Sequence, residues 1–404
     1  MTIQRLETGI PAAIGTRPGG GGASVATAFT GTIRALFPVP CVGAGVAATC
    51  RSILTASAGH FPLELFTARV DRAEALPFAC RHALGPAMRT LPYVATSWLG
   101  QPRLVESYLS AIAPGDLAYL WPSTPLAVYR ELARRGILIA VESLNTRMEV
   151  AKPVLDAAYD RLGLPPDHGI TPARIAEQNE RHALASAIFS PSPATDAAFA
   201  GTALAGRAVP ASYGTWIPNS LGPRAPRAPG QPVTFLFLGT ACIRKGIHHL
   251  LAAWRDVPAT AHLRIVGRVE PAVARLFADV LAQENVTCAG FSRNVSAELA
   301  SADVLVLPSL EEGDPIATYE AAAHGLAVIA SPAGAGRIGA ETGAIDIVAP
   351  HDRDQLRDMI ARFAGSEELR RHRGQSARAA ALLYDWSLAG PQRFSRLSEA
   401  LSSR

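Results

Sequence analysis

The chain has 404 residues, of which 49% are hydrophobic and 18% charged, so it is long enough for two domains and too apolar for extended disorder. No window of about 18 residues is uninterruptedly apolar, which excludes a membrane-spanning helix. The net charge is +4 at pH 7, without basic runs that alternate with aromatic residues, so no nucleic-acid partner is expected. Five cysteines without C-x-x-C spacing argue against a disulfide framework and a zinc site.

The excess of positive charge lies near the N-terminus. Residues 1–150 hold 13 Arg against 9 Asp and Glu, whereas residues 151–404 hold 25 basic and 25 acidic residues. Such an excess is compatible with peripheral association with the inner face of a membrane. The first residues lack a charged start followed by an apolar core, so we expect no secretory signal and a cytoplasmic protein.

The first part of the chain alternates between strands and helices. Residues 1–30 include four consecutive glycines and no apolar periodicity, which predicts a flexible tail. Residues 31–216 then predict a domain with a mostly parallel sheet and helices on both of its faces. The expected strands are Ile33–Phe37, Leu63–Thr67, Leu117–Trp121, Ile137–Val141 and Ala187–Ser190, and the expected helices include Pro125–Arg135, Arg147–Leu162 and Pro172–Ala185.

A second alternation follows a proline-rich linker. Residues 217–232 contain five prolines and separate the first domain from a second one at 233–385, and residues 386–404 predict a C-terminal helix that packs back on the first domain. The expected strands are Val233–Leu238, Leu263–Val266, Val286–Ala289, Asp303–Pro308, Ala327–Ala330 and Ile345–Val348, and the expected helices lie near 246–255, 271–283, 316–324 and 352–363. The fold class is therefore α/β, with two doubly wound domains whose ligands bind beyond the carboxyl ends of the strands.

The most informative stretch is residues 302–331, ADVLVLPSLEEGDPIATYEAAAHGLAVIAS. Three carboxylates follow its strand: Glu311, Glu312 and Asp314. Asp314 is expected to cap the next helix, with Pro315 at the first helical position. The free amides of the first turn, at Ile316 to Thr318, predict an anion site that faces the cleft.

Cations are expected opposite those carboxylates. The first strand of the second domain continues into FLGTACIRKGIHHLLAAW, which delivers Arg244 and Lys245 just before a helix. The planar guanidinium of Arg244 suits phosphate oxygens, and Lys245 supplies a compact charge. The chain has 36 arginines and only two lysines, Lys152 and Lys245, which suggests that an ammonium group is needed at these positions.

The spacing of two glutamates indicates their use. Seven residues separate Glu312 from Glu320, which places Glu320 about 7.5 Å along the helix axis. The two carboxylates are thus spread along a ligand, whereas the paired acids of a hydrolase flank one bond. We interpret them as holders of two hydroxyl-bearing parts of one ligand.

These blocks, together with HLRIVG and VTCAGF, resemble the nucleotide-sugar half of retaining GT-B glycosyltransferases, family 4 in particular, over residues 233–386. The resemblance implies two Rossmann-like domains facing a cleft and transfer of a sugar from a nucleotide diphosphate to a hydroxyl acceptor, in polysaccharide, glycolipid or glycoconjugate biosynthesis. It implies that Arg244 and Lys245 bind the diphosphate, Glu312 the transferred sugar and Glu320 the ribose, and that Glu312, Lys245 and Arg244 are catalytic. Further donor contacts that it implies are Gly239, Thr240, Gly267, Arg268, Phe291, Asp314, Pro315, Ile316 and Ala317. Thr240 stands where the family usually has a second arginine.

The first domain carries a weaker pattern. Residues 43–48, GAGVAA, match a dinucleotide fingerprint with Glu64 about 20 residues further on, but Pro38 and Pro40 separate the glycines from the strand. The resemblance instead implies a glycine loop, with Gly43 and Gly45, over the donor sugar and the acceptor. Where the family commonly has a histidine at a strand end, this chain has Glu142. The candidates for the acceptor or sugar side are Trp121, Glu142, Asn145 and Lys152.

No cofactor and no metal are expected besides the nucleotide-sugar substrate. Asp352-Arg353-Asp354 is a literal D-x-D, but its place at the start of a helix favours helix capping. Three alternatives stay open: a nicotinamide-dependent oxidoreductase that uses GAGVAA, a non-catalytic nucleotide-sugar-binding protein, and a nucleotide-sugar epimerase of similar architecture.

Overall fold

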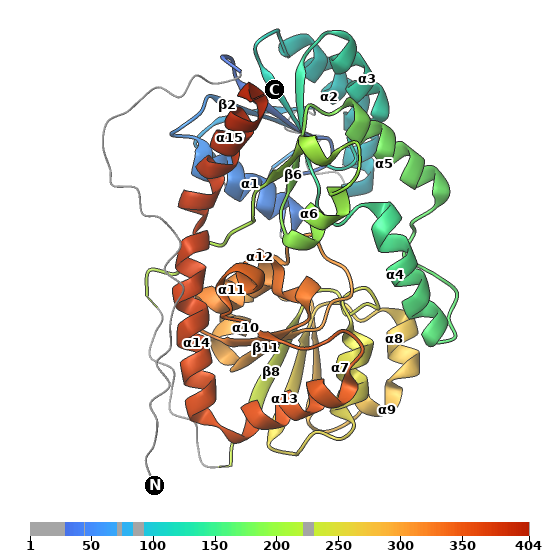
Figure 1. Cartoon of the computed structure of the whole chain (residues 1–404), viewed down its shortest axis with the longest axis vertical. Coiled ribbons are helices and arrows are strands. Elements are labelled where there is room, and N and C mark those ends of the chain that lie inside the picture. The colour runs from blue at the N-terminus through green and yellow to red at the C-terminus, as the bar shows by residue number, and fades with distance from the viewer. Residues whose placement is uncertain (1–28, 44, 71–74, 84–92, 221–229, 404) are drawn as a thin grey trace.

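The computed structural model describes residues 29–43, 45–70, 75–83, 93–220 and 230–403. Most of the tail expected at 1–30 and of the linker expected at 217–232 lies outside these ranges. The described residues form two parallel sheets, each with helices on both faces, stacked along the long axis of the molecule (Figure 1). The prediction of two doubly wound domains is thus confirmed.

The N-terminal domain contains a seven-stranded sheet in the order β3-β2-β1-β4-β5-β6-β7. Its strands are β1 (Ile33–Phe37), β2 (Leu63–Thr67), β3 (Ala79–His82), β4 (Leu117–Leu120), β5 (Leu138–Glu142), β6 (Ala187–Ser190) and β7 (Ala208–Pro210). Its helices are α1 (Val46–Ser57), α2 (Tyr93–Ala111), α3 (Leu126–Arg134), α4 (Met148–Arg161), α5 (Pro172–Leu184) and α6 (Pro193–Phe199). The edge strands β3 and β7 were not expected, because they are short and partly exposed.

The C-terminal domain contains a six-stranded sheet in the order β10-β9-β8-β11-β12-β13. Its strands are β8 (Val233–Leu238), β9 (Ala261–Val266), β10 (Val286–Gly290), β11 (Val304–Leu307), β12 (Ala327–Ala330) and β13 (Asp346–Ile347). Its helices are α7 (Ile247–Trp254), α8 (Pro271–Leu276), α9 (Ala278–Leu281), α10 (Val295–Ser301), α11 (Ile316–Ala323), α12 (Pro332–Thr342), α13 (Arg353–Gly365) and α14 (Glu367–Ala381). The helix expected at 271–283 is two helices, because Phe277 has non-helical dihedrals.

The strand order explains where a ligand can bind. The central strands are short runs of buried, mostly apolar residues, as parallel sheets covered on both faces require. All these strands are parallel, but the direction in which successive strands are added to the sheet reverses between β1 and β4 in one sheet and between β8 and β11 in the other. At such a switch point the two following loops diverge to opposite faces and leave a crevice at the carboxyl ends of the strands. The loops after β8 and β11, which carry the charged motifs, therefore meet at one place.

The two domains are tied together by side chains as well as by the linker. The C-terminal end of α4 belongs to the first domain in sequence, but its Ala158 and Tyr159 pack in the core of the second. In return α15 (Trp386–Ser402) leaves the second domain and packs against α1 and β7 of the first, along one side of the molecule (Figure 1). Two backbone hydrogen bonds join the crossing segments: the Thr215 amide donates to the Tyr384 carbonyl, and the Trp386 amide donates to the Thr215 carbonyl.

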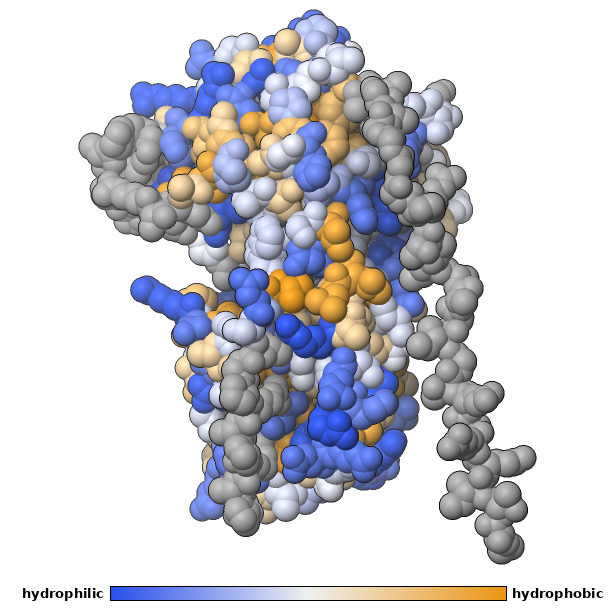
Figure 2. Space-filling model, turned by 90° about the vertical axis from the view of Figure 1, so that its left-hand side faces the viewer, coloured by the Kyte–Doolittle hydropathy of each residue, from blue (hydrophilic) through white to orange (hydrophobic). Residues whose placement is uncertain are grey.

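A small apolar patch marks the passage from α14 into α15. Leu382, Leu383 and Leu388 are about half exposed there, and Figure 2 shows apolar side chains gathered at mid-height on this side of the molecule. Among the described residues, no helix is both long enough and apolar enough to cross a membrane.

Candidate active site

The loops after β8 and β11 place Arg244, Lys245 and Glu312 together. Lys245 Nζ lies 2.5 Å from Glu312 Oε1, and Arg244 Nη1 lies 2.8 Å from Glu312 Oε2. Gly246, which ends the first loop, has φ 68° and approaches Pro308 so closely that a Cβ would lie 1.8 Å from the carbonyl oxygen. Only glycine fits there, and its fit holds the two cations against the end of β11.

Opposing effects act on the acidity of this cluster. Burial works to raise the pKa of Glu312, but the charges and hydrogen bonds of Lys245 and Arg244 outweigh it and lower the pKa to about 2. Burial works to lower the pKa of Arg244, but the carboxylates of Glu312 and Glu311 outweigh it and raise the pKa. Glu312 and Arg244 are therefore both charged at neutral pH. Arg244 also lies 3.6 Å from the Glu311 carboxylate, so the two cations face two carboxylates, and both cations stay partly exposed to an incoming diphosphate.

Glu311 joins the two domains beside this cluster. Its carboxylate accepts hydrogen bonds from Asn145 Nδ2 at 2.7 Å and from the amide and hydroxyl of Thr146 at 2.9 and 2.8 Å. Gly313 lies against the Leu144 carbonyl, where a Cβ would come within 2.0 Å of the oxygen. Asn145, predicted on the acceptor side, thus lies at the cleft and contacts the carboxylate loop.

Asp314 has another role than the predicted helix cap. The N-cap residue of α11 is Pro315, and no side chain caps the helix. The buried Asp314 accepts instead from the Tyr213 amide at 3.0 Å, the Tyr319 hydroxyl at 2.7 Å and the Arg337 amide at 2.9 Å. Burial raises its pKa to about 6 although these hydrogen bonds act in the other direction. The prediction of a helix cap was wrong because the Asp314 carboxylate accepts hydrogen bonds from Tyr213 of the first domain and Arg337 of α12, which are distant along the chain.

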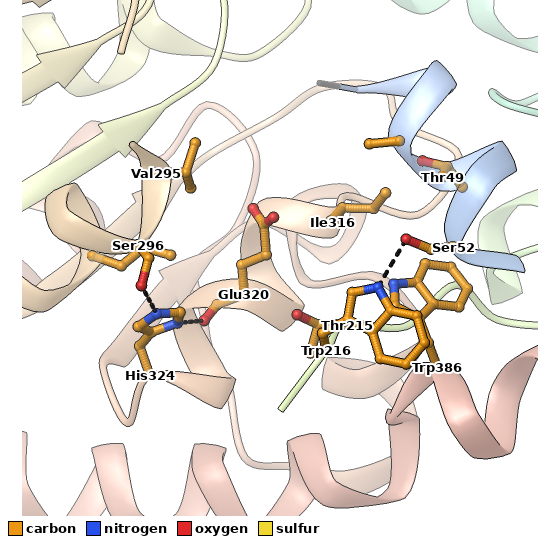
Figure 3. A pocket seen from close by; sticks show the side chains of 12 residues that line it. Thr49, Ser52, Thr215, Trp216, Val295, Ser296, Ile316, Glu320, His324 and Trp386 are labelled. Atoms are coloured by element: carbon orange, nitrogen blue, oxygen red, sulfur yellow. Dashed lines mark hydrogen bonds between the residues drawn. The ribbon is translucent and has the colours of Figure 1, made fainter. Parts of the chain in front are cut away.

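Glu320 lies in a separate small pocket between the domains (Figure 3). Its carboxylate points away from His324, between Val295 and Ile316, and no hydrogen bond to it is found within the described part of the chain. Burial raises its pKa to about 7. Such a carboxylate lacks donors, and a ligand with hydroxyl groups would supply them.

The same pocket contains residues that the sequence interpretation did not single out. It holds about 210 Å³, and its wall includes Ser52 of α1, Trp216 and Trp386 of the crossing segments, and Ser296 of α10. The Trp216 indole donates to Ser52 Oγ at 3.1 Å, and His324 bonds to Ser296 Oγ at 2.9 Å and to the Glu320 carbonyl oxygen at 2.8 Å (Figure 3). The spacing of Glu320 and His324 by four residues on one helix was a usable signal.

The remaining predicted donor contacts lie at the same edge of the sheet. Gly239 and Gly267 follow β8 and β9, and the Gly267 amide donates to the Gly290 carbonyl at 2.7 Å, so the loops after three adjacent strands touch. Thr240 and Arg268 are exposed at this edge, and Phe291 is 75% exposed. The amides of Ile316 and Ala317 open α11, with Ile316 in the wall of the Glu320 pocket.

The glycine loop of the first domain leads into α1. Gly43 and Gly45 have φ 71° and 69°, and the Gly43 carbonyl accepts from Arg51 at 2.9 Å. Ala48, Thr49 and Ser52 of α1 line the pocket that contains Glu320, so this loop and the second domain border one cavity. Glu64, which a dinucleotide site would need, is buried and bonded to Arg34 and Arg81.

Three of the residues predicted for the sugar or acceptor side are buried or paired in the structure. The Glu142 carboxylate is fully buried and is held by Arg393 of α15 and the hydroxyls of Tyr119 and Tyr213, so no sugar reaches it. Trp121 is completely buried in the core of the first domain. Lys152 forms an ion pair with Asp156 one turn along α4, outside the residues that line the cleft cavities.

A larger cavity of about 630 Å³ lies next to the cation cluster. It is enclosed by α4, α5 and the loop after β5 of the first domain, and by Arg244, Glu270 and Glu311 of the second. Sequence patterns gave no signal for it, because its walls come from segments distant along the chain.

No group of three or more His, Cys, Asp or Glu side chains in the described ranges could hold a metal ion. The first aspartate of the D-x-D sequence, Asp352, caps α13 by accepting a hydrogen bond from the Gln355 amide at 2.8 Å.

The fold belongs to the class of two-domain GT-B structures. The chain is similar to sucrose-phosphate synthase from Thermosynechococcus elongatus with a TM-score of 0.69, at 19% identity over 92% of this chain and 100% of the other. Anabaena HepE in complex with UDP-glucose gives a TM-score of 0.64 at 16% identity, with coverages of 92% and 100%. WaaG, a glycosyltransferase involved in lipopolysaccharide biosynthesis, gives 0.60 at 16%, with coverages of 92% and 99%.

Sequence comparison is more specific for the second domain. Residues 232–365, which contain the charged cluster and Glu320, match the family model for glycosyl transferases group 1. The chain is 32% identical over 167 residues to MMP alpha-(1->4)-mannosyltransferase of Mycolicibacterium hassiacum. That match covers 39% of this chain and 41% of the relative. The second domain is thus similar to the group 1 glycosyltransferase domain.

Proposed function

We propose that this protein is a retaining, metal-independent glycosyltransferase that moves a sugar from a nucleotide diphosphate to a hydroxyl acceptor in the cytoplasm, in polysaccharide, glycolipid or other glycoconjugate synthesis. The observation that carries the proposal is the cluster of Arg244, Lys245 and Glu312 at the switch point of the second sheet. It lies beside the amino end of α11, within the residues that match group 1 glycosyltransferases. Within retaining GT-B enzymes we propose family 4, because the spacing of Glu312 and Glu320 resembles the motif of that family.

The donor is expected to extend from the cation cluster to the Glu320 pocket. Arg244, Lys245 and the first amides of α11 would bind the diphosphate, because cations and a helix amino end both favour oxyanions. Glu320 would accept hydrogen bonds from the ribose hydroxyls, which its unpartnered carboxylate favours. The loops at Gly267 and Phe291 would border the base.

The chemistry follows from the charges in the site. The bond between the anomeric carbon and the phosphate oxygen breaks, and the acceptor oxygen bonds to that carbon on the same face. The leaving phosphate oxygen takes the acceptor proton. Arg244 and Lys245 stabilise the negative charge on the diphosphate as it leaves, which in enzymes is often the largest catalytic contribution. Glu312 is a poor nucleophile for this purpose, since two cations lower its pKa to about 2.

Calorimetric binding of UDP, GDP, ADP, TDP and NAD, with and without EDTA, tests the proposal. We expect one nucleoside diphosphate to bind selectively, with no effect of EDTA and much weaker binding to Glu320→Ala than to the exposed control Glu399→Ala. Nuclear magnetic resonance of the product anomer then tests retention. Binding of NAD alone, unchanged in Glu320→Ala, would contradict the proposal. Donor binding without transfer to any acceptor would favour a non-catalytic binding protein, and product formed without an acceptor would favour an epimerase.

A further inference from the structure

The 630 Å³ cavity beside Arg244, here called the interdomain chamber, is large enough for a ligand of its own. Its walls include Met148, Ala151 and Leu155 of α4 and Arg174 of α5. An acceptor oxygen must come within about 3 to 3.5 Å of the reacting carbon, which lies next to the diphosphate. Arg244 lines the chamber, whereas Glu320 lines the other cavity. The chamber is therefore adjacent to the reaction and separate from the expected nucleoside site.

One wall of the chamber is apolar. Met148, Ala151, Leu155 and Tyr159 recur on one face of α4 at intervals of three and four residues and line the chamber together. A second wall is polar, because Arg174, Glu177 and Arg181 lie on one face of α5 and also line the chamber. A ligand that fits both walls has an apolar face and polar edges.

The polar wall is incompletely satisfied by the protein. Arg181 is paired with Glu177 at 2.7 Å, whereas Arg174 donates only to the Gly169 carbonyl at 2.6 Å and has no carboxylate partner among the described residues. Asp167 is exposed at the chamber, and no ion pair with it is found within the described ranges. The wall thus offers both a free donor and a free acceptor.

The charges around the chamber nearly balance. Three arginines line it: Arg174, Arg181 and Arg244. The lining carboxylates are Asp167, Glu177, Glu270 and Glu311; Glu142 also borders the chamber, but its side chain is 0% exposed and paired with Arg393. A strongly anionic or cationic ligand would find little net attraction there. A purely apolar ligand would leave the donors and acceptors desolvated and unpaired, which is costly.

We propose that the interdomain chamber binds the acceptor and that this acceptor is a neutral saccharide, an inference that rests on the proposed glycosyl transfer. The carbon–hydrogen face of a pyranose ring packs on α4. Its hydroxyl groups hydrogen-bond to Arg174 and Asp167, and the reactive hydroxyl points toward Arg244.

The test measures binding to the protein loaded with the nucleoside diphosphate that calorimetry selects. Saturation-transfer nuclear magnetic resonance would compare the neutral probes methyl α-mannoside, methyl α-glucoside and maltose with glucose 6-phosphate, glucosamine and octanol. Binding of at least one neutral saccharide in preference to the charged and apolar probes supports the proposal. Preference for the phosphate, the amine or the alcohol, or no binding of any neutral saccharide at millimolar concentration, overturns it.

Variants of Arg174 locate the site. Arg174→Ala should lower the affinity for the saccharide probe about tenfold to a hundredfold. Arg174→Gln should lose less affinity, since the amide of glutamine still donates to a hydroxyl group. The control Arg130→Ala removes an exposed arginine with one carboxylate partner outside the chamber and should have no effect. Nucleotide affinity should be the same in all three variants. Unchanged saccharide binding in Arg174→Ala would overturn the inference, whereas failure of the wild type to bind any nucleoside diphosphate would overturn the proposed function itself.

Discussion

Glu312 and Glu142 both lie where a parallel strand ends, and both are paired with arginine, yet their surroundings differ. The partners of Glu312 come from the neighbouring loop and keep side-chain exposures of 31% for Arg244 and 15% for Lys245. Arg393, the partner of Glu142, comes from α15, 251 residues further along the chain, and is 1% exposed. The first cluster is accessible to a ligand, whereas the second is sealed inside the first domain. Residue type and strand-end position do not distinguish a site from a structural ion pair, but the partner's origin and exposure do.

The largest effect is expected from breaking the buried pair. Glu142→Ala leaves Arg393 charged and unpaired in the core, which should lower the free energy of unfolding by about 3 to 5 kcal/mol. Urea denaturation measures the loss. The double variant Glu142→Leu, Arg393→Met should lose less than the single variant, because no charge stays buried. If Glu142→Ala were as stable as the wild type, the buried ion pair with Arg393 would not contribute to stability and the prediction would be wrong.

Breaking the accessible cluster should affect turnover and leave folding intact. Lys245→Ala and Arg244→Ala should each lower kcat about 100- to 1000-fold, since each removes a cation that stabilises the leaving diphosphate. Their urea midpoints should stay close to that of the wild type, because Glu312 retains one cation in each case. Steady-state kinetics with Arg357→Ala is the control, because this arginine of α13 pairs with Asp354 and Asp358 and does not line either cleft cavity. A loss of stability instead of turnover would make this cluster structural, like that of Glu142.

The raised pKa of Glu320 predicts that the stability of the protein depends on pH. Burial raises its pKa to about 7, against an ordinary value of 4.5, so the folded protein holds this proton more tightly than the unfolded chain does. Stability contributed in this way is complete below about pH 4.5 and is lost as the pH rises to about 7. Glu320→Gln should therefore raise Tm at pH 8 and leave it unchanged at pH 4.

Glu320→Gln should also weaken nucleotide binding. The ribose hydroxyls donate to the ionised carboxylate, so nucleotide affinity of the wild type should fall as the pH drops below about 7. In Glu320→Gln it should be about tenfold to a hundredfold weaker at pH 8, as expected for loss of hydrogen bonds to a charged group, and independent of pH. Calorimetry from pH 5.5 to 8 checks this, and equal slopes for both proteins would exclude Glu320 from the nucleotide site.

The smallest effect is expected at Lys152. Its ion pair with Asp156 lies on the outer part of α4, and neither residue lines the two cleft cavities described above. Lys152→Ala should leave Tm and kcat/KM unchanged, as is usual for surface ion pairs. A large loss of activity would show that rarity of lysine in the chain marks function at this position too.

The amino-acid sequence by itself determined most strands of both sheets and the charged cluster of the second domain. The strands are contiguous buried runs such as β8, β11 and β12, whose patterns are local. Arg244, Lys245 and Glu312 follow two strands that flank a switch point, so topology alone brings them together.

Tertiary structure decided the rest. Asp314 is held by Tyr213 and Arg337, Glu142 by Arg393, and the chamber by α4 and α5 against loops of the other domain. Each of these depends on segments distant along the chain that meet only when the domains pack and α15 returns to the first domain. A carboxylate's hydrogen-bond partners and exposure are set by that packing, and no local pattern encodes them.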